Sequence, residues 1–320
     1  MNEETPSASP SSGRDASTRI ADLDLRSPDA ICAIFRDAAD ANMQAKCRAG
    51  SVDMIEPVGS ILATGDLHDN PVHFARVLEF AHLHQHTSEH PRHVTLHEII
   101  HGGSLMSGVD LSHRALARVA ALKTFFPEQV HTLLANHELS QIVGLGVVKD
   151  GVRMKEAFLH GVEYVFGDDA KRVNDAIETF IRSMPLALIS GKGTDRGVLF
   201  AHSVPEPALM DRFDASILER DLNDDDYEPR RGGAHLMVWG RRHTPEQMDQ
   251  LAARWGVRAF ILGHEHAQDG IRFVPNNTVI LNSDHDEGVV VRLPLDNPPP
   301  MPPGKANGWE ILPLSDGLEF

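Results

Sequence analysis

The chain has 320 residues, 41% of them hydrophobic, which is enough to bury the core of one large domain or two small ones. Its 30 basic and 46 acidic residues give a net charge of −16 at pH 7, which argues against a surface that holds a nucleic-acid backbone. No apolar run approaches the roughly 20 residues that span a bilayer, and Cys32 and Cys47 are too few for a disulfide framework, so we expect a cytoplasmic protein without membrane contact.

The N-terminal half predicts alternating helices and strands. Its first residues are polar and lack an apolar segment, so we expect residues 1–27 to form a disordered tail and residues 28–295 to form the folded domain. Apolar spacing predicts helices at 27–50, 71–84 and 111–126, and strands at 59–63, 97–103 and 129–135. This alternation predicts an α/β fold with a layered sheet flanked by helices.

The second half begins with two amphipathic helical segments, and we expect residues 141–184 to form a helical lobe inside the domain. Further strands are expected at 186–190, 197–202, 258–263, 278–283 and 288–293, with a helix at 244–256. Residues 296–320 are rich in proline, so we expect a C-terminal extension that does not continue a sheet.

Polar side chains follow four of the predicted strands. Strand ends are rigid positions from which oxygen and imidazole ligands of separate segments can meet around a divalent ion. One such pair is usually structural, but four in succession predict a metal centre. The residues are Asp66, His68, Asn136, His137, His202, His264 and His266.

The histidines between His82 and His101 give a different signal. The chain has 19 histidines, and many of them fall in this window. Their spacing follows no ligand pattern, so we interpret them as solvent-facing or capping residues and not as a metal cluster.

The motifs GDLHD, ANHE, AHSVP and GHEH occur in the order of the signature of the calcineurin-like metallophosphoesterases. The chain resembles this superfamily over residues 55 to 293, and it is most similar to the PPP-type serine/threonine phosphatases. The resemblance implies a β-sandwich of mixed sheets flanked by helices, with the four ligand segments meeting at one edge. It also implies hydrolysis of phosphate monoesters, with phosphoserine or phosphothreonine in proteins as candidate substrates and small phosphomonoesters equally compatible.

The same resemblance implies roles for individual residues. Asp66 and His68 would bind a first metal ion and Asn136, His202 and His264 a second, while His266 matches a further ligand of the first. The donors suit one or two ions of Mn, Fe or Zn, and they suit Ca poorly. His137 would be the general acid that protonates the leaving group, with Asp66 also in the catalytic set.

A phosphate-binding arginine is expected in the loop EPRRGG. Arg230 and Arg231 occupy the place where the family often has such a residue, whose planar guanidinium suits phosphate oxygens. Arg241 and Arg242 are alternatives.

One motif departs from the family. Aligned on its glycines, IIHGGSLMSG places Gly103 where the family has the aspartate that bridges both metals. Met106 then replaces the aspartate that orients the catalytic histidine, and Ser107 replaces an arginine. Nearby substitutes are Asp69, His101 and Asp110, and the spacing selects none of them.

Two functions therefore remain open. The first is a divergent phosphoesterase acting on a phosphorylated protein or small molecule. The second is a catalytically impaired relative that binds a phosphorylated partner or a metal. Retention of seven polar site positions, which cost stability when buried, favours the enzyme. A dinucleotide site is excluded because no G-x-G-x-x-G follows a strand, and a serine hydrolase because G-x-S-x-G is absent.

Overall fold

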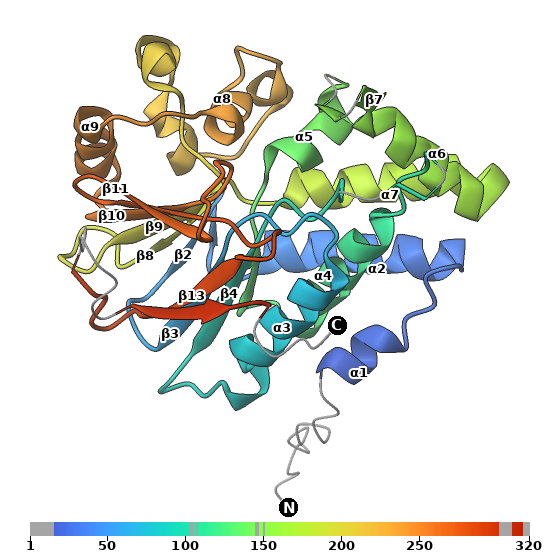
Figure 1. The fold of residues 1–320 in the computed structure, drawn as a ribbon, viewed down its shortest axis with the longest axis horizontal. Helices are drawn as coiled ribbons and strands as arrows, with labels where there is room; N and C mark the ends of the chain where they lie inside the picture. Colours follow the sequence, from blue (N-terminus) through green and yellow to red (C-terminus); the bar gives the residue numbers. More distant parts are fainter. Residues whose placement is uncertain are drawn as a thin grey trace, which may run out of the picture.

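The computed structural model describes residues 16–102, 105–106, 108–144, 147–149, 151–300 and 309–315. Two mixed sheets lie face to face, and helices surround them (Figure 1). This arrangement confirms the predicted sandwich of mixed sheets flanked by helices.

The larger sheet has seven strands in the order β1-β2-β8-β9-β10-β12-β11. These are β1 (Arg48–Ala49), β2 (Val52–Ile55), β8 (Ala187–Ser190), β9 (Val198–Ala201), β10 (Ala259–Leu262), β12 (Thr278–Leu281) and β11 (Ile271–Val274). The smaller sheet has five strands in the order β14-β13-β3-β4-β5. These are β14 (Glu310–Pro313), β13 (Val289–Pro294), β3 (Ser60–Thr64), β4 (Arg92–Leu96) and β5 (Val130–Thr132).

Helices cover the outer faces of both sheets. In Figure 1, α8 and α9 lie at the upper left beside the larger sheet, and most other helices lie on the right. Helix α2 packs against both α4 and α7. The helices are α1 (Ala16–Ala21), α2 (Pro28–Gln44), α3 (Pro71–Ala81), α4 (His113–Phe125), α5 (Asn136–Val143), α6 (Met154–Phe166), α7 (Ala170–Ser183), α8 (Gly233–Trp239) and α9 (Pro245–Trp255).

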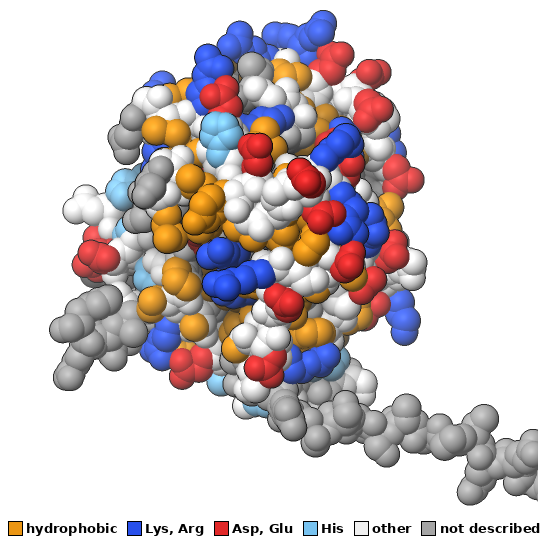
Figure 2. Space-filling view, turned by 90° about the vertical axis from the view of Figure 1, so that its right-hand side faces the viewer, with side chains coloured by type: hydrophobic (Ala, Val, Ile, Leu, Met, Phe, Trp, Pro, Cys, Tyr) orange, Lys and Arg blue, Asp and Glu red, His pale blue; other side chains and the backbone are white. Residues whose placement is uncertain are grey.

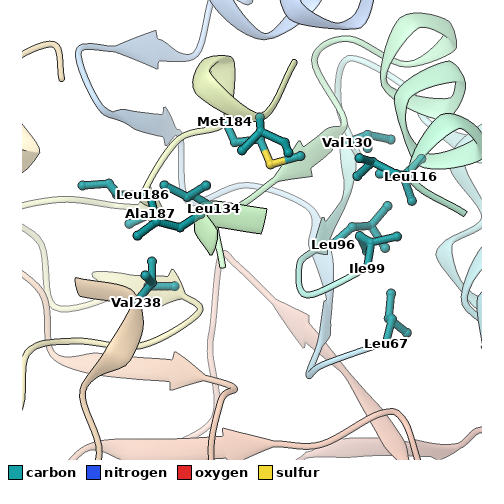
Figure 3. Packing of buried hydrophobic residues seen from close by; sticks show 14 of the residues in the cluster. Leu67, Leu96, Ile99, Leu116, Val130, Leu134, Met184, Leu186, Ala187 and Val238 are labelled. Carbon is teal, nitrogen blue, oxygen red and sulfur yellow. The ribbon is translucent and has the colours of Figure 1, made fainter. Parts of the chain in front are cut away.

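Two apolar clusters hold these layers together. One fills the space between the sheets with side chains from both, among them Ile61, Phe200 and Val291. The other joins the sheets to the helices, and Figure 3 shows part of it, including Leu96, Leu116 and Met184. Strand β3 is buried along both faces, which explains why its sequence is a continuous apolar run and not an alternating one.

The parallel strands β3, β4 and β5 end at one edge of their sheet, and the parallel pair β9 and β10 ends beside them in the other. Loops that leave these ends therefore converge, which is the property that positions the candidate site. Within the described residues no helix is both long and apolar enough to cross a membrane.

The structure corrects three expectations about elements. The strand predicted at 97–103 is instead β4, at Arg92–Leu96, and 97–102 is a loop. Part of the predicted tail 1–27 is ordered, because helix α1 packs on α3 and α4; residues 1–15 lie outside the described residues. The expectation that 296–320 adds no strand is wrong, because Glu310–Pro313, after the prolines, forms the edge strand β14 beside β13.

His113 is a buried histidine away from the sheet edge. Its side chain is fully buried at the start of α4, and neither ring nitrogen has a hydrogen-bond partner among the described residues. The ring packs edge-on against Phe158 and Phe166 of α6, at centroid distances of 6.2 and 5.6 Å. Burial in this apolar contact lowers the pKa of His113 from 6.5 to about 4.

We predict that His113 makes the fold sensitive to acid. The unfolded chain binds a proton here below pH 6.5, whereas the folded chain does so only near pH 4, so stability is lost as pH falls between these values. The loss at pH 5 is about 2 kcal/mol. The free energy of unfolding is measured in urea at pH 7 and at pH 5. It should decrease between the two pH values by about 2 kcal/mol less in His113→Leu than in the unsubstituted chain. The exposed His160→Leu is the control, and an equal acid loss in both variants would contradict the account.

Candidate metal centre

Five segments bring polar side chains together at the convergent strand ends. Asp66 and His68 lie in the loop after β3, and Glu98 lies in the loop after β4. Asn136 and His137 begin helix α5, which follows β5. His202 and His264 follow β9 and β10. All of these side chains are buried except that of His68, which is partly exposed.

Glu98 lies at the centre of the cluster. Its Oε1 atom is 3.1 Å from Nε2 of His68 and 3.5 Å from Nε2 of His137. Its Oε2 atom is 2.7 Å from Nε2 of His202. The two oxygens of this carboxylate therefore face histidines that come from three different segments of the chain.

His202 is surrounded by acceptors. Its Nε2 atom lies 2.7 Å from Glu98 Oε2 and 2.7 Å from Asn136 Oδ1. The same atom is 3.0 Å from Nδ1 of His264. A single N–H donates well to one acceptor only, so the other atoms around it keep unused lone pairs. A bound cation would accept these lone pairs.

The cluster holds two ligand groups that share Glu98, beside a third group of Asp66, His97 and His202. One comprises Glu98 with His68 and His137, and the other comprises Glu98 with His202 and His264. Nδ1 of His68 is 3.1 Å from the carbonyl of Ile100 and can donate to it, which leaves Nε2 with a free lone pair. Carboxylate, amide and imidazole donors of this kind fit Mn, Fe or Zn, so the residues present can hold a divalent ion.

The charges in the cluster depend on one another. Burial alone would lower the pKa of His68, but the carboxylates of Glu98 and Asp66 raise it to about 10. Burial and repulsion from Glu98 raise the pKa of Asp66 to about 7. Burial would also raise the pKa of Glu98, but the surrounding histidines hold it well below its usual range. Binding of a metal would therefore displace protons from this site.

The loop that carries Glu98 is held by a second buried glutamate. Oε1 of Glu138, in the motif NHE, accepts hydrogen bonds from the backbone N–H groups of Ile99 at 2.7 Å and Ile100 at 3.2 Å. Glu98 itself has a backbone φ of 49°, in the left-handed region that residues other than glycine rarely adopt. Such strained positions persist where their surroundings fix them, as Glu138 does here.

His137 lies against a histidine and carboxylate pair. The rings of His137 and His101 have centroids 5.2 Å apart. Nδ1 of His101 donates to Asp110 at 2.6 Å, and Gln141 Nε2 lies 2.7 Å from its other nitrogen. Burial lowers the pKa of His137 to about 3, so its ring is neutral in this arrangement.

Glu98 is the residue that the sequence did not identify. Gly103 and Ser107 lie outside the described residues, and the Met106 side chain is 66% exposed. The loop after β4, HEIIHGG, brings the Glu98 carboxylate between His68 and His202 and the His101 ring beside His137. The solvent-facing interpretation is wrong for His97 and His101, which are both buried beside the centre.

Two other predicted roles do not match the geometry. His266 is exposed, and its ring packs on His285 at 5.3 Å instead of joining the cluster. Arg230 and Arg231 are also exposed, and Arg231 pairs with Glu228 at 2.9 Å. The alternative Arg241 does reach the centre, because its guanidinium is 3.5 Å from Nδ1 of His264.

A second group of potential ligands bridges the two sheets. Cys47, Asp53 and His131 lie close enough together to contact one ion. However, Asp53 already pairs with Arg48 at 3.2 Å and accepts a hydrogen bond from His131 at 2.7 Å. Burial, together with Asp53, raises the pKa of Cys47 to about 12. We therefore interpret this group as a buried salt bridge.

Comparisons with known proteins identify the family and the fold. A model of the calcineurin-like phosphoesterase family matches residues 59–268. One similar structure is a protein serine/threonine phosphatase from Saccharomyces cerevisiae with similarity to human phosphatase PP5. It matches with a TM-score of 0.67 and 16% sequence identity, and the match covers 93% of this chain and 98% of the yeast chain. A second is a cold-active protein-tyrosine phosphatase from a Shewanella species, with a TM-score of 0.49 and 15% identity. This match covers 76% of this chain and 77% of the Shewanella chain. No curated protein matches the sequence. The yeast structure shares the fold.

We predict that Glu98→Gln weakens manganese binding. The amide keeps the shape of the side chain but removes the negative charge between the two ligand groups. Equilibrium dialysis against Mn should show an affinity at least tenfold lower than that of the unsubstituted chain. Glu246→Gln, at an exposed carboxylate on α9, should bind Mn normally. Unchanged manganese affinity in Glu98→Gln would contradict the central position of this carboxylate.

Proposed function

Because the chain belongs to the calcineurin-like phosphoesterase family, we propose that it hydrolyses phosphate monoesters with the help of divalent metal ions. The observation that carries this proposal is the buried Glu98 carboxylate between His68 and His202. Bound ions would supply the positive charge that activates a water molecule and neutralises the phosphate. Mn, Fe or Zn suits the donors, as one ion or two.

The ligand groups suggest which residues hold each ion. Asp66, His68 and Glu98 would form one site, because the charges of both carboxylates act on His68, and Glu98 would contribute to the second site with Asn136, His202 and His264. The shared carboxylate would reduce the repulsion between two cations. Asp66 also accepts a hydrogen bond from the backbone N–H of His264 at 2.9 Å, which ties the two sides together.

His137 is the proposed general acid. Its Nε2 atom is 3.5 Å from Glu98 Oε1, which is longer than the distances from Glu98 to His68 and His202, so we assign His137 to proton transfer and not to metal binding. A phosphate dianion next to the ring would favour its protonated form. The imidazolium could then donate its proton to the leaving alkoxide. The pair of His101 and Asp110 limits the positions that the ring can adopt.

The phosphate and the group that carries it also have candidate contacts. We propose that Arg241 binds phosphate oxygens, because its guanidinium is exposed and next to His264. A cavity of about 360 Å³ opens beside His68, lined also by Lys149 and Asp284. This space supports a substrate larger than phosphate alone, with phosphoserine or phosphothreonine in a protein as one class and small phosphomonoesters as another.

The alternative of an impaired relative that only binds a phosphorylated partner is less supported. It depended on the loss of the shared carboxylate, and the buried Glu98 between His68 and His202 is a candidate for that role. The thiols of Cys32 and Cys47 are both free, which agrees with a cytoplasmic location.

We predict that the chain with Mn hydrolyses p-nitrophenyl phosphate and that His137→Asn lowers kcat by about 10²- to 10⁴-fold. Because His137 lies in one of the ligand groups, the manganese content of this variant is measured alongside kcat, and lost turnover with retained manganese supports the role of acid. Arg241→Gln should mainly raise KM. A panel of phosphopeptides, nucleotides and sugar phosphates would then rank the natural substrate classes.

Two results would decide against the proposal. An inert chain that nevertheless contains manganese and binds phosphopeptides would support the impaired relative. Full activity in His137→Asn would remove the assigned acid. Arg242→Gln is the matched control for Arg241→Gln, since Arg242 is also exposed in the same loop.

A further inference from the structure

A cavity of about 360 Å³ lies between α1, α3 and α4, behind the loops that carry the candidate metal ligands. Its walls are mainly apolar. They include Ile20 of α1, Phe74 and Leu78 of α3, and Val119 of α4. A cavity of this size is in the range that holds a small-molecule ligand.

The inner wall belongs to the candidate metal centre. Leu67 lies between Asp66 and His68 in the sequence, and Ile99 directly follows Glu98. Both side chains line the cavity, and Figure 3 shows them within the same apolar cluster. A molecule in the cavity would therefore contact both ligand loops through Leu67 and Ile99.

Arginines lie at the mouth of this cavity. Arg118 lines both the cavity and an adjoining hollow of about 290 Å³, which Arg26 and Arg114 also line. Within the described parts of the chain none of the three forms an ion pair, although the net charge is −16. On the face seen in Figure 2, basic side chains lie beside apolar ones, with acidic side chains among them.

Among the described residues, the acidic groups nearby form no ion pair with these arginines. Asp24 lines the hollow, but its Oδ1 atom already accepts hydrogen bonds from the backbone N–H groups of Arg26 and Ser27. Asp69 lines the cavity, and its carboxylate attracts Arg114 and Arg118. The atoms are too far apart for an ion pair within 4.0 Å. The cavity thus combines an apolar interior with a cationic rim.

We propose that this cavity binds a free linear carboxylate of medium chain length, a fatty-acid-like anion. Its tail would lie between Phe74, Leu78 and Val119, where it is removed from water. Its carboxylate would pair with Arg114 and Arg118, which are one helical turn apart on α4 and offer planar donors that match two oxygens. Direct binding tests this site, so the proposal does not depend on the phosphoesterase activity.

Isothermal titration of the full chain with hexanoate, octanoate and decanoate tests the tail. Each added methylene that enters the cavity should tighten binding by about fourfold, until the space is filled. Decanoate should bind at least tenfold more tightly than decanol, because only the acid pairs with the arginines. Equal affinities for the acid and the alcohol would overturn the proposal.

Variants separate the tail from the headgroup. The double variant Arg114→Gln with Arg118→Gln should lose at least tenfold in affinity for decanoate and keep its affinity for decanol. Arg36→Gln, at an exposed arginine of α2, is the matched control. Ala115→Phe, which places a ring in the cavity, should abolish binding of both compounds.

Another occupant would give a different result. Residues 316–320 contain acidic and apolar side chains in the sequence DGLEF. If decanoate binds only to a chain that ends at residue 315, the cavity belongs to that segment and the proposal fails. Affinity that does not change in the double arginine variant would also overturn it.

Discussion

The candidate site depends on a carboxylate buried among imidazoles. Glu98 is 3% exposed, and its oxygens contact His68, His137 and His202. Burying an isolated carboxylate costs several kcal/mol, so the charge persists only with positive partners. Protons on His68 and His202, whose pKa values the nearby carboxylates raise, provide these partners in the metal-free chain, and divalent ions would replace them. The remaining ligands are arranged around this charge.

The fold supplies the rigidity that this arrangement needs. Parallel strands of two sheets end at one edge, so each ligand is within a few residues of a fixed hydrogen-bonded strand. The backbone also passes close to the ligands. A Cβ atom added at Gly263 would lie 2.6 Å from Asp66 Oδ1 and 2.5 Å from the ring of His97. Only glycine permits this approach of the β10 loop to the β3 loop.

The apolar runs and helical periodicity predicted a layered α/β fold, and the resemblance of the motifs to the family implied the sandwich of mixed sheets. The sequence also identified the segments that bear Asp66, His68, Asn136, His202 and His264, which the structure brings together. It missed Glu98 because the strand was predicted several residues too late. The segment IIHGG looks more apolar than β4 itself, which contains His93 and Thr95. The sequence misassigned His266 because the direction of a side chain after a strand end depends on the backbone, and His264 turns with a φ of 66°.

The most direct test of the account is anomalous diffraction at the manganese edge from crystals grown with MnCl₂. The account predicts manganese bound by the Glu98 carboxylate, with Asp66 and His68 or with Asn136, His202 and His264 completing its ligands. Manganese elsewhere, such as between Cys47, Asp53 and His131, with Glu98 bound only to histidines, would contradict it.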